Sequence, residues 1–580
     1  MKKSLYLLLI VQFIIVSHFF CPLEIFNSDP IINDDFPIHQ NQVSTNLFLV
    51  KDYNFLDYNF IGGRLVVGST RKLQALAFYS LAIPGINEII LFKLYFFLIN
   101  LFAPFFIFIA SKNFLLNKRA CIISLILGII GWNFSSIIHP LTYYGLFPFL
   151  FFILLTLLGI SYFFKFYITN KQPSFWLALM FFIYSYLVHA HYFVITIPLI
   201  GLLLFIRGKR KGPFNNIILI SFLGFSAFTI TNVFLILLKN PFISGLQLFH
   251  QGKGLIELLA NIQNFPMYVF VCLLGFSYCF ISKDKRFKFV FLSLGSLFLI
   301  AGYFGNYLPF SAFQFQRAIY FLFIFMLIPA AAMLDLIISK KSWKLLAILI
   351  LVIIIVFMVS DYSLQAQTKL KLTTKNPYPD LIGHLSTPGA GRLLIENSGF
   401  KTGHVYGGHI NYLFPKFTDR ELAGENFPYK PLTDNNFIGD LSEGRFHGQS
   451  VSNYSCEELD RGMSLVNVQT IVAWNETTKT KLESCQSFFT EIASIAPFKV
   501  FEVKNKSTNF LIGSGTIQNK VTKLQVNSSS NQVVLKYRYH PCLRTKPELI
   551  VEPYSVIFTE NINATFILIK NKGQNFIINC

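Results

Sequence analysis

Two adjacent carboxylates, Asp34 and Asp35, are the side chains best suited to chemistry in this sequence. They follow an apolar run over residues 5–20 and precede His39 at a short interval. Two carboxylates at a membrane face can hold a divalent cation such as Mg²⁺ or Mn²⁺ through oxygen ligands. One of them can instead act as a general base toward an acceptor hydroxyl. The alternative is a solvated acidic loop, because the polar segment 21–85 is rich in acidic residues.

Further polar residues lie in later connections between apolar runs, on the same predicted side of the membrane. Arg317 lies at the start of an apolar helix, where an arginine without a partner is costly, and its planar guanidinium suits a phosphate. Alternatively, the Arg317 side chain extends to the membrane surface or pairs with a nearby carboxylate. Each histidine, taken alone, is more typical of a packing residue than of a ligand. Because these residues converge on one face, we predict that they bind substrate there. Together with His39, which we also predict to bind substrate, they are His139, Tyr143, Tyr144, His189, His191, Gln316 and Arg317.

The composition excludes most protein classes. Of the 580 residues, 53% are hydrophobic and only 13% are charged, and the mean hydropathy is +0.52. A soluble protein carries about 25% charged residues. Disorder and collagen are excluded by 67 phenylalanines. A polytopic α-helical membrane protein remains.

The apolar runs predict eleven transmembrane helices. The first, over residues 5–20, has the position of a signal peptide, but no A-x-A cleavage site follows it, and we predict an uncleaved helix. Residues 175–206 form either one long helix or two short ones broken near His189-Ala-His191. The other ten spans are expected at 89–110, 120–138, 145–164, 174–188, 191–206, 217–238, 264–282, 288–307, 315–338 and 345–360.

Charge in the connections predicts the topology. The connections expected on one side carry 18 Lys and Arg residues, and the intervening ones carry seven. By the positive-inside rule the basic side is cytoplasmic, which puts the amino terminus inside the plasma membrane and the carboxy-terminal part outside. The net charge of +20 arises mainly before Ser360, where 26 basic residues face 10 acidic ones. It therefore follows from topology, and no nucleic-acid partner is expected.

Residues 361–580 have an ordinary charge content and recurrent short β-like runs. We predict a multi-pass domain over 1–360, an extracytoplasmic mixed α/β region over 361–515 and a mainly β region over 516–580. Residues 570–574 predict a hairpin turn between the last two strands. The strands are expected at 392–396, 466–474, 498–504, 532–538, 549–558, 564–570 and 575–579.

Four of the eight cysteines, Cys456, Cys485, Cys542 and Cys580, lie in this outer part. An even number outside the cytoplasm suits two disulfides, for which three pairings exist. Cys456–Cys485 with Cys542–Cys580 is the most local pairing, and four free thiols are the alternative. No Cys/His zinc spacing occurs.

The chain resembles a family of GT-C-like polytopic membrane proteins labelled "6-pyruvoyl-tetrahydropterin synthase-related", with relatives among YfhO-type membrane proteins. The resemblance spans nearly the whole chain and rests on the order of four motifs. They are Asp34-Asp-Phe-Pro-Ile-His39, which matches a D-x-x-x-H segment at Asp35 and His39; Ala77-Phe-Tyr-Ser80; Tyr144-Gly-Leu-Phe-Pro148; and the strand pair 465–472 and 498–503.

The resemblance implies a GT-C fold and transfer of a hexosyl or pentosyl group from a polyprenyl-phosphate-linked donor to a glycan or protein acceptor at the cell surface. An essential acid in the first outer loop is implied, and that role would fall on Asp35 or Asp34. No W-W-D-type motif is present, so an oligosaccharyltransferase that carries this motif is not expected. The rival interpretations are a non-catalytic envelope or assembly factor, and a transporter of lipid-linked sugars. Asp335, the clearest acid inside a span, lies one turn from the basic Lys340 and weakens the transporter interpretation.

Overall fold

In the computed structural model the chain forms two compact units. One unit holds the helices up to α15; the other holds everything from α17 onward and the short β1–β2 pair (Leu56–Asp57 and Arg64–Leu65). The described residues are 2–20, 25–26, 56–57, 64–65, 87–135, 137–138, 147–188, 266–304, 317–340, 377–386, 391–397, 414–423, 441–520, 523–539, 543–559, 562–571 and 573–579.

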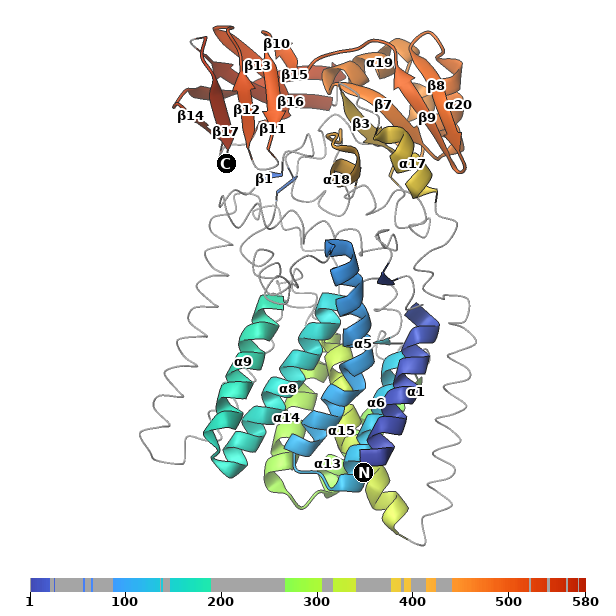
Figure 1. Cartoon of the computed structure of the whole chain (residues 1–580), viewed down its shortest axis with the longest axis vertical. Coiled ribbons are helices and arrows are strands. Elements are labelled where there is room, and N and C mark those ends of the chain that lie inside the picture. The colour runs from blue at the N-terminus through green and yellow to red at the C-terminus, as the bar shows by residue number, and fades with distance from the viewer. Residues whose placement is uncertain are drawn as a thin grey trace. The chain divides into compact units, whose positions relative to one another are not determined.

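The first unit is a bundle of apolar helices that lie side by side in Figure 1. Four of them, α5, α8, α14 and α15, are long and apolar enough to cross a membrane, so this is a membrane protein. The described helices are α1 (Lys2–Phe20), α5 (Glu88–Asn113), α6 (Lys118–Phe134), α8 (Phe147–Thr169), α9 (Gln172–Val188), α13 (Pro266–Ile281), α14 (Lys285–Phe304) and α15 (Ala318–Ser339).

These helices overlap eight of the eleven predicted spans. The spans predicted at 191–206, 217–238 and 345–360 lie outside the described residues, as does the break near His189, so the count of eleven stays a prediction.

The basic flanks of the described helices gather at one end of the bundle. Phe114, at the end of α5, packs on Phe164 near the end of α8 and on Phe291 near the start of α14, at ring distances of 5.1 and 4.8 Å. Asn117, before α6, donates to Asp335 near the end of α15. We call this the basic end, and the other the opposite end. The residues that flank helices at the basic end are Lys2, Lys3, Lys112, Lys118, Arg119, Lys165, Lys171, Lys283, Lys285, Arg286, Lys288 and Lys340.

Helix α15 is the buried axis of the described bundle, and almost every side chain from Ala318 to Ile337 is enclosed. Glycines of the neighbouring helices let it approach closely. A Cβ added at Gly131 of α6 would lie 3.1 Å from Phe323, and one at Gly275 of α13 would lie 3.0 Å from the Met326 sulfur. Because membrane helices gain contact area through such small residues, α15 is held on several sides.

The second unit begins with a mixed α/β layer. Its sheet has the order β3-β7-β9-β8, in which β3 runs parallel to β7 and the other neighbours are antiparallel. Strand β7 is buried along its whole length, as expected for a central strand. The elements are α17 (Tyr378–Leu385), β3 (Arg392–Ile395), α18 (Phe414–Thr418), α19 (Cys456–Leu465), β7 (Val468–Ala473), α20 (Glu476–Ser484), β8 (Phe489–Ile495) and β9 (Phe498–Val503), with the small β4–β5–β6 sheet (Leu441–Ser442, Arg445–Phe446, Gln449–Ser450) and a short 3-10 turn (Val451–Asn453).

A β-sandwich follows, made of two four-stranded sheets with orders β10-β13-β16-β15 and β11-β12-β17-β14. Side chains from both sheets, among them Leu524, Leu535 and Ile567, form its core. The strands are β10 (Phe510–Ile512), β11 (Thr516–Asn519), β12 (Leu524–Asn527), β13 (Gln532–Arg538), β14 (Arg544–Lys546), β15 (Ile550–Thr559), β16 (Ile562–Lys570) and β17 (Phe576–Asn579).

The hairpin predicted at residues 570–574 is wrong. Strand β16 pairs with β13 and β15, whereas β17 pairs with β12 and β14 in the other sheet. The connection crosses between sheets, and the Asn571 side chain holds it by donating to the carbonyls of Ser528 and Gln574 at 3.1 Å each. Gly573 supplies the positive φ of 69° that lets the chain turn there.

Candidate functional site

Of the predicted catalytic and substrate-binding residues, Arg317 is the one that lies within the described part of the chain. It directly precedes α15 at the opposite end of the bundle. Its guanidinium lies over the ring of Phe149 of α8, 5.5 Å from the ring centroid. Tyr320 packs edge-on against the same ring at 6.0 Å. Within the described part of the chain, no carboxylate pairs with Arg317. A ring beneath the guanidinium helps to orient it, and a planar guanidinium is a group that suits an anion such as a phosphate.

Two buried tyrosines brace α13 and α14 at the level of the first turn of α15. The Tyr303 hydroxyl donates to the Tyr268 hydroxyl at 3.3 Å. Gly302, next to Tyr303, lies against Ile319, two residues beyond Arg317. Both tyrosines are enclosed, so their role in this arrangement is to support the helix that carries Arg317.

The other predicted site residues lie outside the described residues. They are Asp34, Asp35, His39, His139, Tyr143, Tyr144, His189, His191 and Gln316. The convergence of these side chains on Arg317, and a cation held by the two aspartates, therefore stay predictions. Among the described residues, no group of three His, Cys, Asp or Glu side chains is arranged to hold a metal ion.

Lys93 is a charged residue that the sequence reasoning passed over. It lies in the second turn of α5, toward the opposite end, and is 2% exposed. A single lysine inside an otherwise apolar span is a signal that could have found it, since intramembrane charges are costly and usually functional or paired. Its position adds a second cation to the half of the bundle that holds Arg317.

Asp335, the acid on which a transporter interpretation would depend, is fully engaged at the basic end. Arg119 forms an ion pair with it, and Asn117 donates to its other oxygen at 2.6 Å. A carboxylate held by two groups from α6 and its preceding loop ties α15 to α6. It is therefore better suited to a structural role than to carrying a proton or ion.

In the second unit, Arg392 joins the α/β layer to the β-sandwich. It is 1% exposed and donates to the Glu421 carboxylate and to the carbonyls of Val466 and Lys536 at 2.8 to 2.9 Å. Its guanidinium also stacks on Tyr537 at 4.4 Å, and the Tyr537 hydroxyl donates to Glu421. These contacts reach from β3 to β13, so they lock the two parts of the unit together.

Burial shifts the proton affinities in this seam. It lowers the pKa of Lys536 to about 8, with the charge of Arg392 adding to the effect. It also lowers the pKa of Arg420 to about 10. Burial alone would lower the pKa of Arg392 as well, but the charge of Glu421 and the hydrogen bond to that carboxylate outweigh it and raise that pKa. The seam therefore strains the charged form of Lys536 most.

Glu396, at the end of β3, is a fully buried carboxylate with four donors. One oxygen accepts from the Gly444 amide and the Thr478 hydroxyl, and the other accepts from the amides of Trp474 and Asn475, at 2.7 to 2.9 Å. Burial raises the pKa of Glu396 against the opposing effect of these donors. With all its acceptor positions occupied, this acid organises the start of α20 and offers no free oxygen to a substrate.

A disulfide joins Cys456, the first residue of α19, to Cys485, which follows α20. This is the more local of the pairings considered from the sequence. The cysteines Cys542 and Cys580 lie outside the described residues. Cys121, Cys272 and Cys279 are free and buried in the helical unit.

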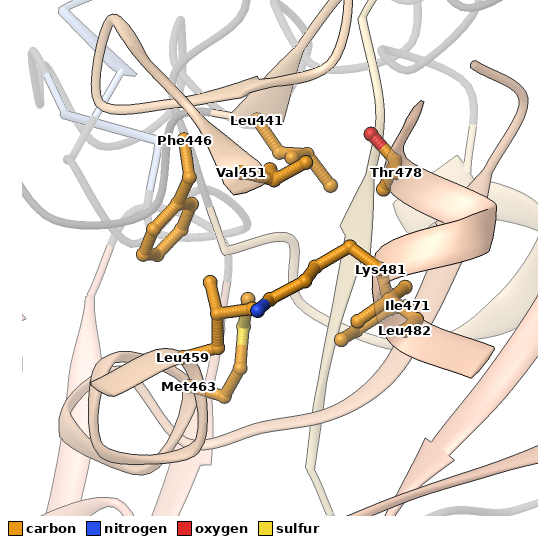
Figure 2. Close-up of a pocket in the computed structure, with 9 residues that line it drawn as sticks. All are labelled: Leu441, Phe446, Val451, Leu459, Met463, Ile471, Thr478, Lys481 and Leu482. Atoms are coloured by element: carbon orange, nitrogen blue, oxygen red, sulfur yellow. The ribbon is translucent and has the colours of Figure 1, made fainter. Parts of the chain in front are cut away.

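A small cavity lies between α19 and α20, and Figure 2 shows apolar side chains around it with the stem of Lys481 across its side. Its empty volume is about 250 Å³. Its lining is almost entirely apolar, so the cavity is a packing gap in the core of the α/β layer and offers a sugar few hydrogen-bond partners. Its lining residues are Leu441, Phe446, Val451, Leu459, Met463, Ile471, Thr478, Lys481 and Leu482.

Comparison with solved structures identifies the fold. The chain is similar to the apo oligosaccharyltransferase of Archaeoglobus fulgidus, with a TM-score of 0.50 and 11% identity over 80% of this chain and 69% of the other. It is also similar to the oligosaccharyltransferase AglB from the same organism in complex with an inhibitory peptide and a dolichol-phosphate, with a TM-score of 0.52 and 11% identity over 81% and 69%.

No protein-family profile matches the sequence. No curated protein matches it either. At 11% identity the structural similarity shows the fold alone, which is that of a GT-C-like membrane protein. The resemblance to the pterin-synthase-related and YfhO-type families stays a prediction.

Proposed function

We propose that this chain is an integral membrane glycosyltransferase that moves a hexosyl or pentosyl group from a polyprenyl-phosphate-linked donor to a glycan or protein acceptor at the outer face of the plasma membrane. The observation that carries the proposal is the GT-C-like fold, shared over four fifths of the chain with an oligosaccharyltransferase. That neighbour was solved with a dolichol-phosphate and a peptide, which supports a lipid-linked donor here by analogy.

The proposed step assigns roles to the two aspartates and to Arg317. Asp35, or Asp34, takes the proton of the acceptor hydroxyl. If these acids held a divalent cation, it would supply a Lewis acid that makes a nearby hydroxyl easier to deprotonate. The acceptor oxygen forms a bond to the anomeric carbon while the bond from that carbon to the phosphate oxygen breaks. The leaving polyprenyl phosphate keeps the electron pair, and Arg317 balances its negative charge. The stacking of Arg317 on Phe149 suits this role because it fixes the guanidinium before the charge develops.

The experiment that tests the proposal is a mass-spectrometric profile of surface glycans and polyprenyl-linked sugars in the native host. It compares the native strain, a deletion strain, and the deletion complemented with Asp35→Asn or Asp34→Asn. Asp52→Asn, in the same acidic segment, is the matched control. We expect the deletion to lose a sugar that the native chain and Asp52→Asn restore, while at least one of the other two variants accumulates in the membrane and fails to restore it.

Restoration of the native profile by both Asp34→Asn and Asp35→Asn would contradict the proposal. So would a deletion strain whose profile is unchanged. Either result would favour the alternative of a non-catalytic envelope or assembly factor, in which neutral substitutions of these acids and of Arg317 are tolerated. The transporter alternative has less support, because Asp335 is already held by Arg119 and Asn117.

A further inference from the structure

Helix α5 contains Pro104, which removes one hydrogen bond from the helix. Pro104 has no N–H group, so the carbonyl of Asn100, four residues earlier, loses its helical donor. Inside a membrane no water replaces that donor, and an unsatisfied carbonyl is costly. A neighbouring helix must therefore supply a hydrogen bond at this point.

Gln12 of α1 supplies it. Its side-chain nitrogen donates to the carbonyl of Asn100 at 2.8 Å, and the residue is completely buried. The side-chain oxygen of Gln12 accepts from Asn133 of α6, also at 2.8 Å. One amide thus repairs the break in α5 and binds α6 at the same time.

The side chain of Asn100 closes the network. Its oxygen accepts from the indole N–H of Trp132 at 2.9 Å, and its nitrogen donates to the carbonyl of Phe96 at 2.8 Å. The result is a polar cluster of Gln12, Asn100, Trp132 and Asn133 that joins three helices. A cluster with its amide groups satisfied specifies one arrangement of those helices.

Helix α1 depends on this cluster for its place. Its other face is exposed in the described bundle, as shown by Tyr6, Leu7, Ile10 and Ile14, so few other contacts orient it. Besides the polar cluster, two ring pairs hold it: Phe13 with Phe97 at 6.0 Å and Phe19 with Phe134 at 6.2 Å.

Through α6, the cluster also links α1 to α15, the helix that follows Arg317. Along the sequence, α1 leads directly into the acidic segment with Asp34 and Asp35. On α6, Gly131 is adjacent to the cluster residue Trp132 and packs against Phe323 of α15, within two turns of Arg317. The separation between the end of α1 and the start of α15 is therefore set through α6.

We infer that Gln12 is a positioning residue of the site: by satisfying the Asn100 carbonyl that Pro104 leaves free, it fixes α1 against α5 and α6. It thereby sets the end of α1 relative to the start of α15, which Arg317 directly precedes. This inference rests on the proposed function for its effect on sugar transfer, and on the described hydrogen bonds for its effect on α1.

A double-mutant cycle tests it in the full-length chain. The variants are Gln12→Leu, Pro104→Ala and both together, and Ser17→Ala is the matched control. Ser17 lies on the same helix, and its buried hydroxyl has no hydrogen-bond partner among the described residues. The readouts are sugar transfer by complementation, and oxidative cross-linking of Phe19→Cys with Phe134→Cys in each background.

We expect Gln12→Leu to lower both the cross-linking rate and transfer by roughly 3- to 20-fold, the range of buried hydrogen bonds in membranes. Pro104→Ala restores an N–H that the Asn100 carbonyl can accept within α5. In that background, the loss of cross-linking and of transfer caused by Gln12→Leu should therefore be several-fold smaller. If Gln12→Leu does not accumulate, Gln12→Met, which keeps the side-chain length, takes its place in the cycle.

The inference is overturned if Gln12→Leu has the same cross-linking rate and transfer as Ser17→Ala. It is also overturned if Gln12→Leu lowers both readouts equally in the native and the Pro104→Ala backgrounds. Reduced cross-linking with full transfer also overturns it, since α1 would then not position the site. Failure of the proposed function is distinguishable, because it is read from Asp35→Asn and Asp34→Asn with Gln12 intact.

Discussion

Three buried charges among the described residues are each held by several groups. Asp335 has a cation and an amide, Glu396 has four donors, and Arg392 has a carboxylate, two carbonyls and an aromatic ring. Removing one partner of such a group leaves the remainder buried and unpaired, which costs more than the pair contributes. Substitutions at these positions are therefore informative about local structure before they are informative about function.

Lys536 makes the stability of the second unit depend on pH. Burial and the charge of Arg392 lower its pKa to about 8 in the folded chain from the usual 10.5. The unfolded chain then binds more protons between about pH 8 and 10.5, so the free energy of unfolding rises with pH across that window. Below pH 8 both states are protonated and this contribution is absent. We expect a slope on the order of 1 kcal/mol per pH unit within the window.

The measurement is urea unfolding of the full-length chain in detergent at pH 7 to 10, followed by proteolysis of the second unit. Lys536→Met is the comparison, because it removes the titrating group. Other groups titrate in both proteins, so the difference between the two curves isolates Lys536. A difference that does not change with pH would contradict the prediction.

At the scale of elements, α15 and its glycine neighbours determine how Arg317 is presented. The approach of α14 to the first turn of α15 leaves no space at Gly302, where an added Cβ would lie 2.7 Å from Ile319. The helix that carries the candidate arginine is thus positioned by backbone proximity as well as by side chains.

Gly302→Ala is expected to destabilise the helical unit by about 1–2 kcal/mol, because overpacking outweighs the gain in helix propensity. Thermal unfolding in detergent measures it. Gly383→Ala is the control: Gly383 lies in α17, and nothing lies within 4 Å of an added Cβ. The control should be neutral or stabilising by up to about 1 kcal/mol. Equal effects at the two positions would disprove the packing argument.

The disulfide between α19 and α20 closes a loop of 29 residues. By the chain-entropy relation, its loss should lower the free energy of unfolding by about 3–4 kcal/mol. Replacement of Cys456 and Cys485 by serine, with chemical denaturation of the full chain, checks this. In a background with Cys542 and Cys580 replaced by serine, reduction of the chain that keeps Cys456 and Cys485 should reproduce the loss and leave the variant without them unaffected. A double variant as stable as the native chain would show that other contacts of α19 and α20 suffice.

At the scale of the whole molecule, the shared fold separates architecture from activity. The chain lacks a W-W-D-type motif, and for that reason the sequence did not predict an oligosaccharyltransferase that carries this motif. Its fold is nevertheless similar to that of an oligosaccharyltransferase. A fold can host several reactions, and the residues of the site decide among them. The similarity therefore shows the fold, and the donor and the acceptor stay part of the proposal.

The predicted topology puts the basic end in the cytoplasm and the second unit outside. In a background without the free cysteines, Ser339→Cys reports the basic end and Ser452→Cys reports the second unit; both positions are exposed. We expect an impermeant maleimide to label Ser452→Cys, and not Ser339→Cys, in sealed right-side-out vesicles. Inside-out vesicles should give the reverse. Labelling of both positions from one side would refute this topology.

Much of the local structure was determined by the sequence itself. Long apolar runs predicted the described helices, because a chain in lipid must satisfy its backbone internally and does so as helices. β-rich runs between turn residues predicted the strands at β3, β7, β9, β13, β15, β16 and β17. Charge in the connections predicted which helix ends share a side, and the described basic flanks do gather at one end.

Only the tertiary structure decided which distant residues meet. Sequence patterns report local burial, whereas the placement of β17 in the second sheet, the stacking of Arg317 on Phe149 and the burial of Arg392 each need contacts far along the chain. The clearest case is Gln12, an unremarked polar residue in an apolar run. Its role became visible only when folding brought it to the carbonyl that Pro104, ninety-two positions later, leaves without a donor.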